Sequence, residues 1–429
     1  MLIQFSVKNF KSIGEKKVFS MAVADKKSTQ RFSRESGNNF ASPLLTTACI
    51  FGPNGGGKTS LINAMDFFKD FVVDSARTQK EEEIQGVIPF KLDTILSTQP
   101  SEFEAIFVVD GTLYQYGFSV DSERVHGEWL FMRSTLKGAK LIPVFQREFN
   151  GAEYAWDLKN VKGQKTTWSK NTKPNTLFLS EAMRGNAESE SLAKPFAWIQ
   201  KSLRILESPQ RLSSGFTAGN FKQGKWREKI LNLLGATDTK ITDIEVIEKK
   251  VIPSDIPKFV LEEVPKEFLD DLFNGKLLSM DVFSSHLNTL GNTVKFSFEK
   301  EESDGIQVLF NIAGPWFDVL ENGYTLVVDE LHNSLHPHAL QFLVNLFYDE
   351  TINTKNAQLI FTSHETSVMN KGFMHRDQIW FMCRNDAQQS ELYSLAEFKN
   401  ERAISSFQKS YLSGRFGALP KIGVFHGER

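Results

Sequence analysis

One eight-residue stretch constrains the fold more than any other part of this 429-residue sequence. It follows an apolar run at 44–51 and precedes residues 61–68, whose apolar side chains recur at helical spacing. The pattern is G-x-x-x-x-G-K-[ST], complete and in the strand–loop–helix context that gives it meaning. The sequence therefore predicts a phosphate-binding loop. Its residues are Gly52, Pro53, Asn54, Gly55, Gly56, Gly57, Lys58 and Thr59.

The chemistry of this loop follows from its residue types. Glycines let backbone N–H groups turn toward phosphate oxygens, and the helix that follows points its positive end at the same anion. We expect Lys58 to contact the β- and γ-phosphates of ATP, and the Thr59 hydroxyl to hold Mg²⁺. A chance glycine-rich turn is the alternative, and the agreement of pattern and context argues against it. The remaining expected nucleotide contacts are Asn54, Gly55, Gly57 and Ser60.

A second signal is the apolar run 325–328, which ends in Asp329 and Glu330. Beside a phosphate-binding loop, such acids serve as metal ligand and as orienting group for the attacking water. We expect Asp329 to bind Mg²⁺, through water, and Glu330 to polarise that water. Taken alone, a strand ending in two acids is common and a solvated turn is the alternative. The loop at 52–59 favours the catalytic interpretation.

Two weaker signals accompany these. Ser303 and Gly305 precede an amphipathic run at 308–320, so they offer a hydroxyl and free N–H groups at a helix start, although a simple helix cap is the alternative. The apolar run 359–361 leads to His364, which we expect at the carboxyl edge of the sheet, where ligands of open α/β folds bind. A lone histidine there is more often structural, so this signal depends on the others.

The pattern of elements predicts an α/β fold in three parts. Residues 1–121 alternate like strands around the loop, and we expect this first part to hold the loop and an antiparallel N-terminal β-subdomain. Residues 301–429 alternate helices and strands, which is typical of a parallel sheet with covering helices. We expect residues 122–300 to be a mostly helical insertion. Its predicted helical stretches are 191–206, 226–234 and 265–273.

Composition excludes several classes of protein. The two cysteines are far apart, which argues against a disulfide framework or a zinc pair. With 50 basic and 52 acidic residues, the chain lacks the excess of positive charge that is typical of nucleic-acid-binding proteins. The overall balance does not exclude a local basic groove. No signal peptide or membrane-spanning run is evident, so we expect a cytoplasmic protein without a membrane partner.

The order of the four signals resembles the ABC-type P-loop ATPase head shared by SMC and RecF proteins. The chain resembles more closely the bacterial AAA ATPases related to the overcome-lysogenisation-defect (OLD) proteins. This resemblance extends over most of the chain, from about residue 3 to 422, and is least specific in the centre. The segments that carry it are Lys-Asn-Phe-Lys-Ser-Ile at 8–13, Pro-Phe-Lys-Leu at 89–92, Phe-Leu-Ser at 178–180, Ser-Leu-His-Pro at 334–337 and Gly-Arg-Phe-Gly-Ala-Leu-Pro at 414–420.

The resemblance implies a slow ATPase whose site is shared by two heads packed head to tail. One copy would supply residues 52–59, Asp329, Glu330 and His364, and the other would present Ser303 and Gly305 to the γ-phosphate. Residues 334–336 would be the D-loop that bridges the sites. Members of the family often serve as ATPase switches or scaffolds in phage defence, beside a separately encoded effector such as a nuclease or toxin.

Some features depart from the family pattern. The segment Ser-Asp-Gly-Ile-Gln at 303–307 replaces the more usual Ser-x-Gly-Thr/Glu-Lys/Gln, and the Q-loop glutamine is not identified, with Gln85 and Gln115 as candidates. The chain has no Asp-x-Asp motif, and 65 residues follow His364, which argues against the Toprim nuclease domain of OLD enzymes.

Three functions remain in view: a defence switch, a DNA-repair or DNA-end-binding ATPase of RecF/SMC type, and a module in which nucleotide only stabilises an oligomer. The two acids at 329–330 argue against a module that only binds nucleotide, because such a site does not need a catalytic base. The spacing of His332, His336 and His338 is compatible with a metal site or an HNH nuclease. Their position directly behind Glu330 favours a loop and helix start near the dimer interface.

Overall fold

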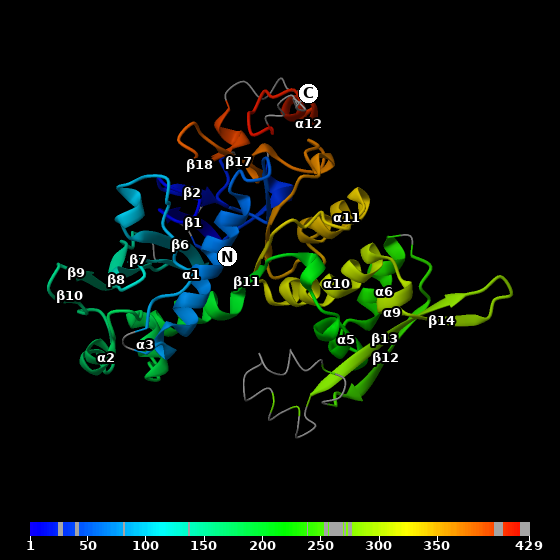
Figure 1. Cartoon of the computed structure of the whole chain (residues 1–429), viewed down its shortest axis with the longest axis horizontal. Helices are drawn as coiled ribbons and strands as arrows, with labels where there is room; N and C mark the ends of the chain where they lie inside the picture. The colour runs from blue at the N-terminus through cyan, green and yellow to red at the C-terminus, as the bar shows by residue number, and fades with distance from the viewer. Residues whose placement is uncertain are drawn as a thin grey trace, which may run out of the picture. The chain divides into compact units, whose positions relative to one another are not determined.

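The computed structural model describes residues 1–24, 29–38, 43–79, 82–135, 138–237, 239–252, 277–398 and 406–420, with the single positions 256, 269 and 272. They group into two compact units (Figure 1). The first unit is Met1–Glu207, Val319–His332 and Gln341–Arg429, and the second is Ser208–Asp318 and Asn333–Leu340. The first division between these units falls at 207–208, whereas the predicted parts divide at 121–122.

An antiparallel sheet forms one layer of the first unit. Its strand order is β10-β9-β8-β7-β6-β1-β2, and every neighbouring pair is antiparallel. The predicted antiparallel subdomain is thus confirmed, and it extends past residue 121. The strands are β1 (Leu2–Lys8), β2 (Lys17–Ser20), β6 (Ser101–Val109), β7 (Thr112–Val120), β8 (Val125–Arg133), β9 (Ile142–Phe149) and β10 (Tyr154–Asp157).

The second layer is the predicted parallel core. The order is β11-β15-β16-β5-β17-β18, parallel throughout except for the β17–β18 hairpin. All residues of β5, β15 and β16 are buried, which explains their continuous apolar runs. The strands are β11 (Leu203–Leu206), β15 (Thr325–Val328), β16 (Gln358–Thr362), β5 (Thr47–Phe51), β17 (Ile379–Arg384) and β18 (Ser390–Ser394).

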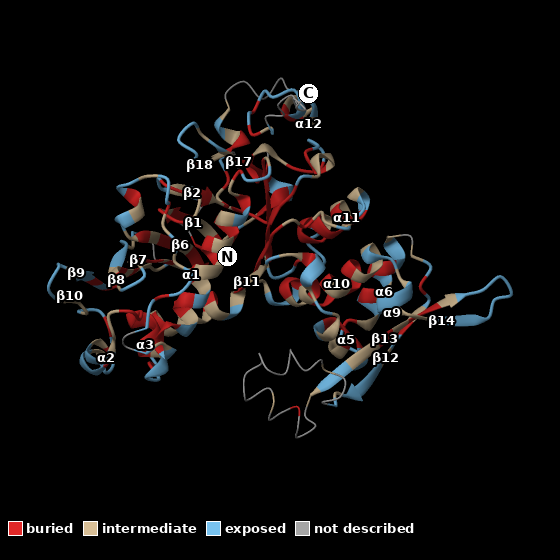
Figure 2. Ribbon diagram, in the orientation of Figure 1, coloured by how far each residue is buried: buried red, intermediate tan, exposed pale blue. Residues whose placement is uncertain are grey.

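Helix α1 (Lys58–Asp74) joins the two layers into one core. Its buried residues include Leu61, Met65 and Phe68, and they belong to a hydrophobic cluster that takes in both sheets. The Phe68 ring stacks on Phe118 of β7 with centroids 5.5 Å apart. Figure 2 shows this buried interior in red. Because both β5 and α1 are buried, the loop between them is fixed at its two ends.

The expectation of a mostly helical segment at 122–300 is wrong for the described residues. Strands β8 to β10 belong to the first sheet, and the second unit holds a three-stranded antiparallel sheet, β12-β13-β14. The stretch 191–206 begins as helix, in α4 (Glu190–Ala197) and the π-helix η4 (Trp198–Ser202), but ends as β11. A short run such as Leu-Arg-Ile-Leu suits either period, and pairing with β15 decides it.

Of the two other helices predicted in this segment, the structure describes only one. The helix at 226–234 is confirmed as α6 (Arg227–Ala236), whereas 265–273 lies outside the described residues except for positions 269 and 272. The remaining elements of the second unit are α5 (Gly215–Lys222), η5 (Pro209–Arg211), β12 (Asp243–Lys250), β13 (Leu278–Leu287), β14 (Thr293–Ser297), α9 (Phe298–Glu301) and most of α10 (Asp304–Asn322).

The later helices and strands of the chain follow the prediction. Helix α10, strand β15, helix α11 and strands β16 and β17 occur in the predicted order, and α11 is Pro337–Tyr348. In the described part of the chain, no helix has the length and apolar character required to cross a membrane. Short elements complete the fold: η1 (Gln30–Phe32), β3 (Ser33–Arg34), β4 (Leu44–Leu45), η2 (Ser75–Arg77), η3 (Leu96–Thr98), α2 (Lys165–Asn171), α3 (Phe178–Arg184), η7 (Thr366–Val368), η8 (Arg376–Gln378), η9 (Leu395–Glu397) and α12 (Phe407–Leu412).

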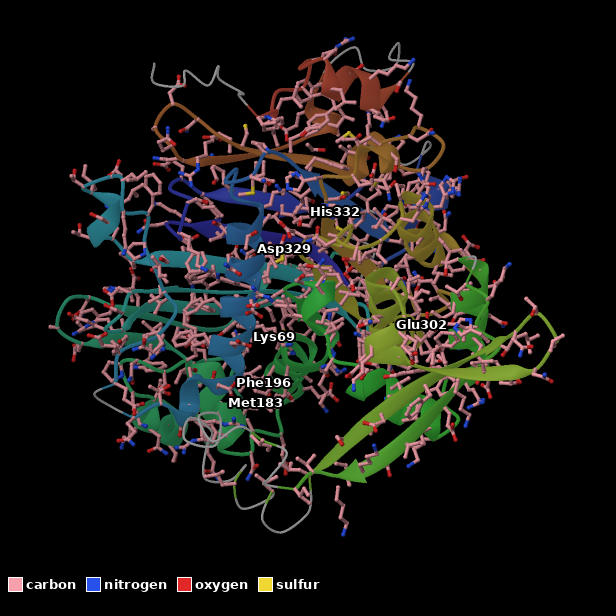
Figure 3. The ribbon with its side chains drawn as sticks, turned by 45° about the vertical axis from the view of Figure 1, so that its right-hand side comes forward. Lys69, Met183, Phe196, Glu302, Asp329 and His332 are labelled. Carbon is pink, nitrogen blue, oxygen red and sulfur yellow. The ribbon has the colours of Figure 1, made fainter. Side chains whose placement is uncertain are left out.

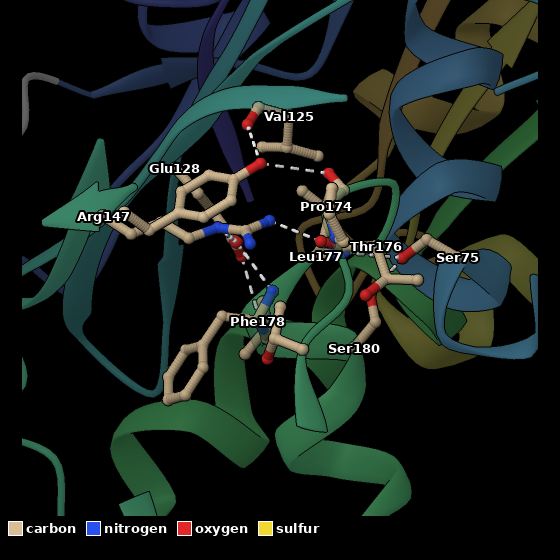
Figure 4. A network of polar contacts seen from close by, with 12 residues as sticks. Ser75, Val125, Glu128, Arg147, Pro174, Thr176, Leu177, Phe178 and Ser180 are labelled. Carbon is tan, nitrogen blue, oxygen red and sulfur yellow. Dashed lines mark hydrogen bonds and ion pairs between the residues drawn. The ribbon is translucent and has the colours of Figure 1, made fainter. Parts of the chain in front are cut away.

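A buried ion pair holds the antiparallel sheet to helix α3 (Figure 4). Glu128 and Arg147 have fully buried side chains, with Nε of Arg147 3.0 Å from the Glu128 carboxylate. The same carboxylate accepts hydrogen bonds from the Tyr116 hydroxyl at 2.9 Å and from the backbone N–H of Phe178 at 2.7 Å and Leu179 at 3.0 Å. Glu128 therefore has a partner for each lone pair, as a buried charge requires.

The serine of the same Phe-Leu-Ser segment ties α3 to the end of α1. The Ser180 hydroxyl donates to the Val72 carbonyl at 2.5 Å and accepts from Ser75 at 2.9 Å. This segment, which carries part of the family resemblance, thus fixes the far end of the helix that begins at Lys58.

Replacing Glu128 by alanine is expected to destabilise the protein by about 3–5 kcal/mol, because it leaves the Arg147 guanidinium buried without its counter-charge. Urea denaturation followed by circular dichroism measures this. The control is Glu102→Ala, which removes a partly exposed pair with Lys16 and is expected to cost less than about 1 kcal/mol. Equal losses in the two variants would contradict the role given to the buried pair.

Candidate functional site

The predicted phosphate-binding loop requires its glycines for both conformation and space. Gly55 and Gly57 have φ of +74° and +110°, in the region that side chains rarely adopt. A Cβ at Gly57 would lie 2.1 Å from the Ser390 hydroxyl, and one at Gly52 would lie 1.9 Å from the Met382 carbonyl. The loop is therefore packed directly against strands β17 and β18.

Lys58, the first residue of α1, folds back beneath the loop. Its Nζ donates to the carbonyls of Gly52 at 2.8 Å and Pro53 at 3.1 Å, and lies 3.2 Å from Nε2 of His364. Burial lowers the pKa of Lys58, while the charges of Asp329 and Glu330 oppose that shift. The loop is thus built over a partly desolvated cation, which favours an anion at this place.

Asp329 connects the loop to the parallel sheet. The Thr59 hydroxyl donates to one of its carboxylate oxygens at 2.7 Å, and the Thr362 hydroxyl donates to the other at 2.5 Å. Strands β15 and β16 are neighbours, and β16 also pairs with β5, so the ends of three strands meet here. The Thr59 and Asp329 oxygens are ligands of the kind that Mg²⁺ prefers, so the residues present fit that ion.

Glu330 has a left-handed backbone, with φ of +52°. Such a conformation costs about 1–3 kcal/mol in a non-glycine residue, and it is stabilised here by a hydrogen bond from the Glu330 N–H to the Thr362 hydroxyl at 2.7 Å. Thr362 therefore orients both acids of the Asp-Glu pair. Figure 3 labels Asp329 and, on the same segment, His332.

A cavity of about 300 Å³ lies over the loop. Seven predicted site residues line it, and Asp329 and His364 lie behind it through their contacts with Thr59 and Lys58. Neither Gln85 nor Gln115 is among its lining residues; Gln85 is exposed and the Gln115 amide donates to Glu104. The cavity is lined by Ser12, Pro53, Asn54, Gly55, Gly56, Gly57, Lys58, Thr59, Ser60, Glu330 and Arg384.

Sequence reasoning missed four side chains around this cavity. Arg384 donates through Nε to the Gly55 carbonyl at 2.7 Å, and Ser12 donates to Ser60 and accepts from Ser390, both at 2.8 Å. Thr362 is the fourth. Ser12 and Thr362 had a signal, because they belong to the segments 8–13 and 359–364. Arg384 and Ser390 come near the loop through the β17–β18 hairpin, which no local pattern indicates.

His364 is exposed at the protein surface, beside two other basic groups. Partial desolvation lowers its pKa, and the charges of Lys58 and His332 lower it further. The rings of His364 and His332 meet edge to face with centroids 5.5 Å apart. The lowered pKa favours the neutral imidazole, which has one nitrogen available as donor and one as acceptor.

Ser303 and Gly305 belong to the second unit. Ser303 is exposed, and a Cβ at Gly305 would lie 2.9 Å from the Ser334 carbonyl. The structure therefore packs the segment 303–307 against the predicted D-loop. His336 and His338 lie in this unit too, whereas His332 lies in the first. Among the described residues, no group of three or more His, Cys, Asp or Glu side chains has an arrangement suited to a metal ion.

A family model described as "AAA domain, putative AbiEii toxin, Type IV TA system" matches residues 48–370. This span holds the loop, both acids and His364. The chain belongs to this AAA-domain family. It is therefore an ATPase of the ABC/AAA type, as the motifs predicted.

Solved structures similar to this chain include the SMC head domain from Thermotoga maritima, with 12% identity, a TM-score of 0.38, and coverage of 92% of this chain and 98% of that one. Another is the recombination mediator RecF with bound nucleotide, with 10% identity, a TM-score of 0.34, and coverage of 90% and 96%. A third is the Smc head domain from Pyrococcus yayanosii, with 11% identity, a TM-score of 0.33, and coverage of 92% and 96%. No curated protein matches the chain.

The surroundings of His364 predict its titration. In the nucleotide-free protein, the midpoint measured by NMR is expected below the ordinary value of 6.5, because partial desolvation and Lys58 disfavour the imidazolium. In Lys58→Met the midpoint is expected to rise toward 6.5, since a neighbouring positive charge is gone while the partial desolvation remains. A wild-type midpoint at or above 6.5 would contradict this geometry.

Proposed function

We propose that this chain is the ATP-binding and ATP-hydrolysing switch subunit of a bacterial anti-phage defence complex, in which ATP is held between two copies. The main support is that Lys58, Thr59 and Glu330 line one cavity over a glycine loop, and that Asp329 accepts a hydrogen bond from Thr59. These residues come from two distant parts of the chain, and a structural turn alone does not need all four. The family description names a putative toxin, which supports a link between this chain and a toxic activity.

The loop and Lys58 would bind the phosphate chain. Asn54, Gly55, Gly57 and Ser60 surround the start of α1, where backbone N–H groups and the helix dipole favour an anion. Lys58 now donates to loop carbonyls, and it would reach the β- and γ-phosphates by turning from them. Its lowered pKa reflects a cation that has lost water, and phosphate would replace that lost solvation.

Thr59 and Asp329 would hold Mg²⁺, whose positive charge would offset the charge developing on the phosphates. Glu330 lines the same cavity and would orient the attacking water. His364 lies 3.2 Å from Lys58 and would face the same phosphate as a neutral donor. Thr362 would keep the two acids in their separate roles, because its hydroxyl contacts both residues.

A second copy would complete the site with Ser303 and Gly305. Ser303 is exposed at the start of the 19-residue helix α10, and a helix N-terminus of that length favours a phosphate. The packing of Gly305 on Ser334 supports a single surface that carries both the 303–307 segment and the D-loop. ATP binding would then also be an assembly event between at least two protomers.

The effector would be a separate protein of the cytoplasm, a nuclease or a toxin. The absence of an Asp-x-Asp motif supports this division of labour. Phage challenge of cells that express this chain with and without its neighbouring genes tests it, and full protection by this chain alone would count against it. ATP-dependent binding of bare DNA at physiological salt would instead favour a DNA-repair or DNA-end-binding ATPase.

Two substitutions test the site itself. Lys58→Ala is expected to abolish ATP binding, because the phosphates lose their buried cation. Glu330→Gln is expected to bind ATP normally and to lower kcat by about 100-fold or more, which is the usual contribution of a positioned base. It is also expected to trap the ATP-bound dimer, measured by light scattering after gel filtration.

The control is Glu350→Gln, which changes a carboxylate that is 76% exposed. It is expected to leave binding, turnover and assembly at wild-type values. Unchanged turnover in Glu330→Gln would remove Glu330 from its proposed role.

A further inference from the structure

Glu302 directly precedes Ser303, yet the two side chains have opposite environments. The Glu302 side chain is only 6% exposed, whereas Ser303 is exposed. Figure 3 labels Glu302, which lies between the end of α9 and the start of α10. A carboxylate this far from water needs hydrogen-bond partners, so the contacts of Glu302 define where this part of the chain is held.

Both partners of the carboxylate come from strand β13. The Ser284 hydroxyl donates to Oε1 of Glu302, and Nε2 of His286 lies 2.6 Å from the same oxygen. Ser284 is fully buried, and the His286 ring packs edge to face on Phe296 of β14 with centroids 4.8 Å apart. We call Ser284, His286 and Glu302 the β13 clamp.

The main chain after Glu302 is held from the helix side. The Gln307 side-chain amide donates to the carbonyls of Glu302 at 3.0 Å and Glu299 at 3.2 Å, and the Gln307 N–H donates to the Ser303 carbonyl at 3.0 Å. Gly305, two residues after Ser303, packs against the Ser334 carbonyl. Ser303 is therefore an exposed residue between two anchored neighbours.

We propose that Glu302 is a positioning residue for ATP hydrolysis: through the β13 clamp, it sets the place of the Ser303 hydroxyl and of the first N–H groups of α10 toward the γ-phosphate held by another copy. This inference rests on the proposed function. Preorganised donors stabilise a transition state because no energy is spent on ordering them during the reaction. A misplacement of about 1 Å can lower a rate by as much as about 100-fold.

The positioning role makes a prediction that a merely structural role does not. Ser303 would act on the ATP of the other copy, whereas each copy binds its own ATP through Lys58 of the first unit. Loss of the clamp would therefore lower kcat and weaken ATP-driven dimerisation, and leave ATP affinity of the monomer unchanged. A global loss of folding would lower all three together.

The experiment compares Glu302→Ala, Glu302→Gln and the control Glu245→Gln in the full-length protein. Glu245 pairs with Lys295 on the same three-stranded sheet, and both side chains are about half exposed, at 45% and 56%. Glu302→Ala is expected to lower kcat by about 10- to 100-fold, with unchanged ATP affinity in equilibrium titrations of dilute protein. Glu302→Gln is expected to recover most of that loss, because the amide oxygen still accepts from both donors. Glu245→Gln is expected to match the wild type.

A double variant decides whether Glu302 acts through Ser303. Glu302→Ala combined with Ser303→Ala is expected to be no slower than Ser303→Ala alone, since the positioned hydroxyl is already gone. If Glu302→Ala fails to fold, His286→Phe replaces it in the same comparison, because it removes the Nε2 donor and keeps an aromatic ring against Phe296.

Wild-type turnover in Glu302→Ala, or a loss that adds fully to that of Ser303→Ala, would overturn the positioning role. These results differ from a failure of the proposed function, in which the wild-type chain itself would not turn over ATP or Ser303→Ala would be as active as the wild type.

Discussion

The hydrogen bonds that Thr59 and Thr362 donate to the Asp329 carboxylate are the interaction on which the site depends. They bring together the start of α1 and the carboxyl ends of β15 and β16, which are separated by some three hundred residues of sequence. A buried carboxylate has to be satisfied, so the loop, the acidic pair and the sheet edge are held as one assembly. Thr362 adds the contact that stabilises the left-handed backbone of Glu330.

Basic side chains lie close to the Asp329 carboxylate. Lys58 is partly desolvated beneath the loop, and it lies against His364, whose own pKa is lowered by partial desolvation and by that lysine. The partly desolvated Lys58 cation favours an anion between the loop and the sheet edge. Gly52, Gly56 and Gly57 are required by the same packing, because a Cβ at any of them would clash with β17 or β18.

The parts of the fold that sequence could predict are those set by local pattern. The complete loop motif, the buried run ending at Asp329 and the alternation of β6 and β7 gave the layers and most of the cavity lining. Long-range pairing explains the failures: β11 became a strand only because β15 lies beside it, and the antiparallel sheet extended through β8 to β10. Arg384 and Ser390 reach the loop through a hairpin, and Glu302 reaches β13 through a contact made only in the fold, so local pattern did not predict these three contacts.

The central claim is that each ATP site is completed by a second copy, and mixing two inactive variants tests it most directly. Lys58→Ala destroys the phosphate cradle, and Ser303→Arg blocks the surface offered to the other copy. Each variant alone is predicted to be inactive. Mixed in equal amounts, they would form some dimers with one intact site, built from the loop of one variant and the Ser303 of the other, and ATPase activity would return. A mixture no more active than either variant alone, or full activity of Ser303→Arg by itself, would contradict the account.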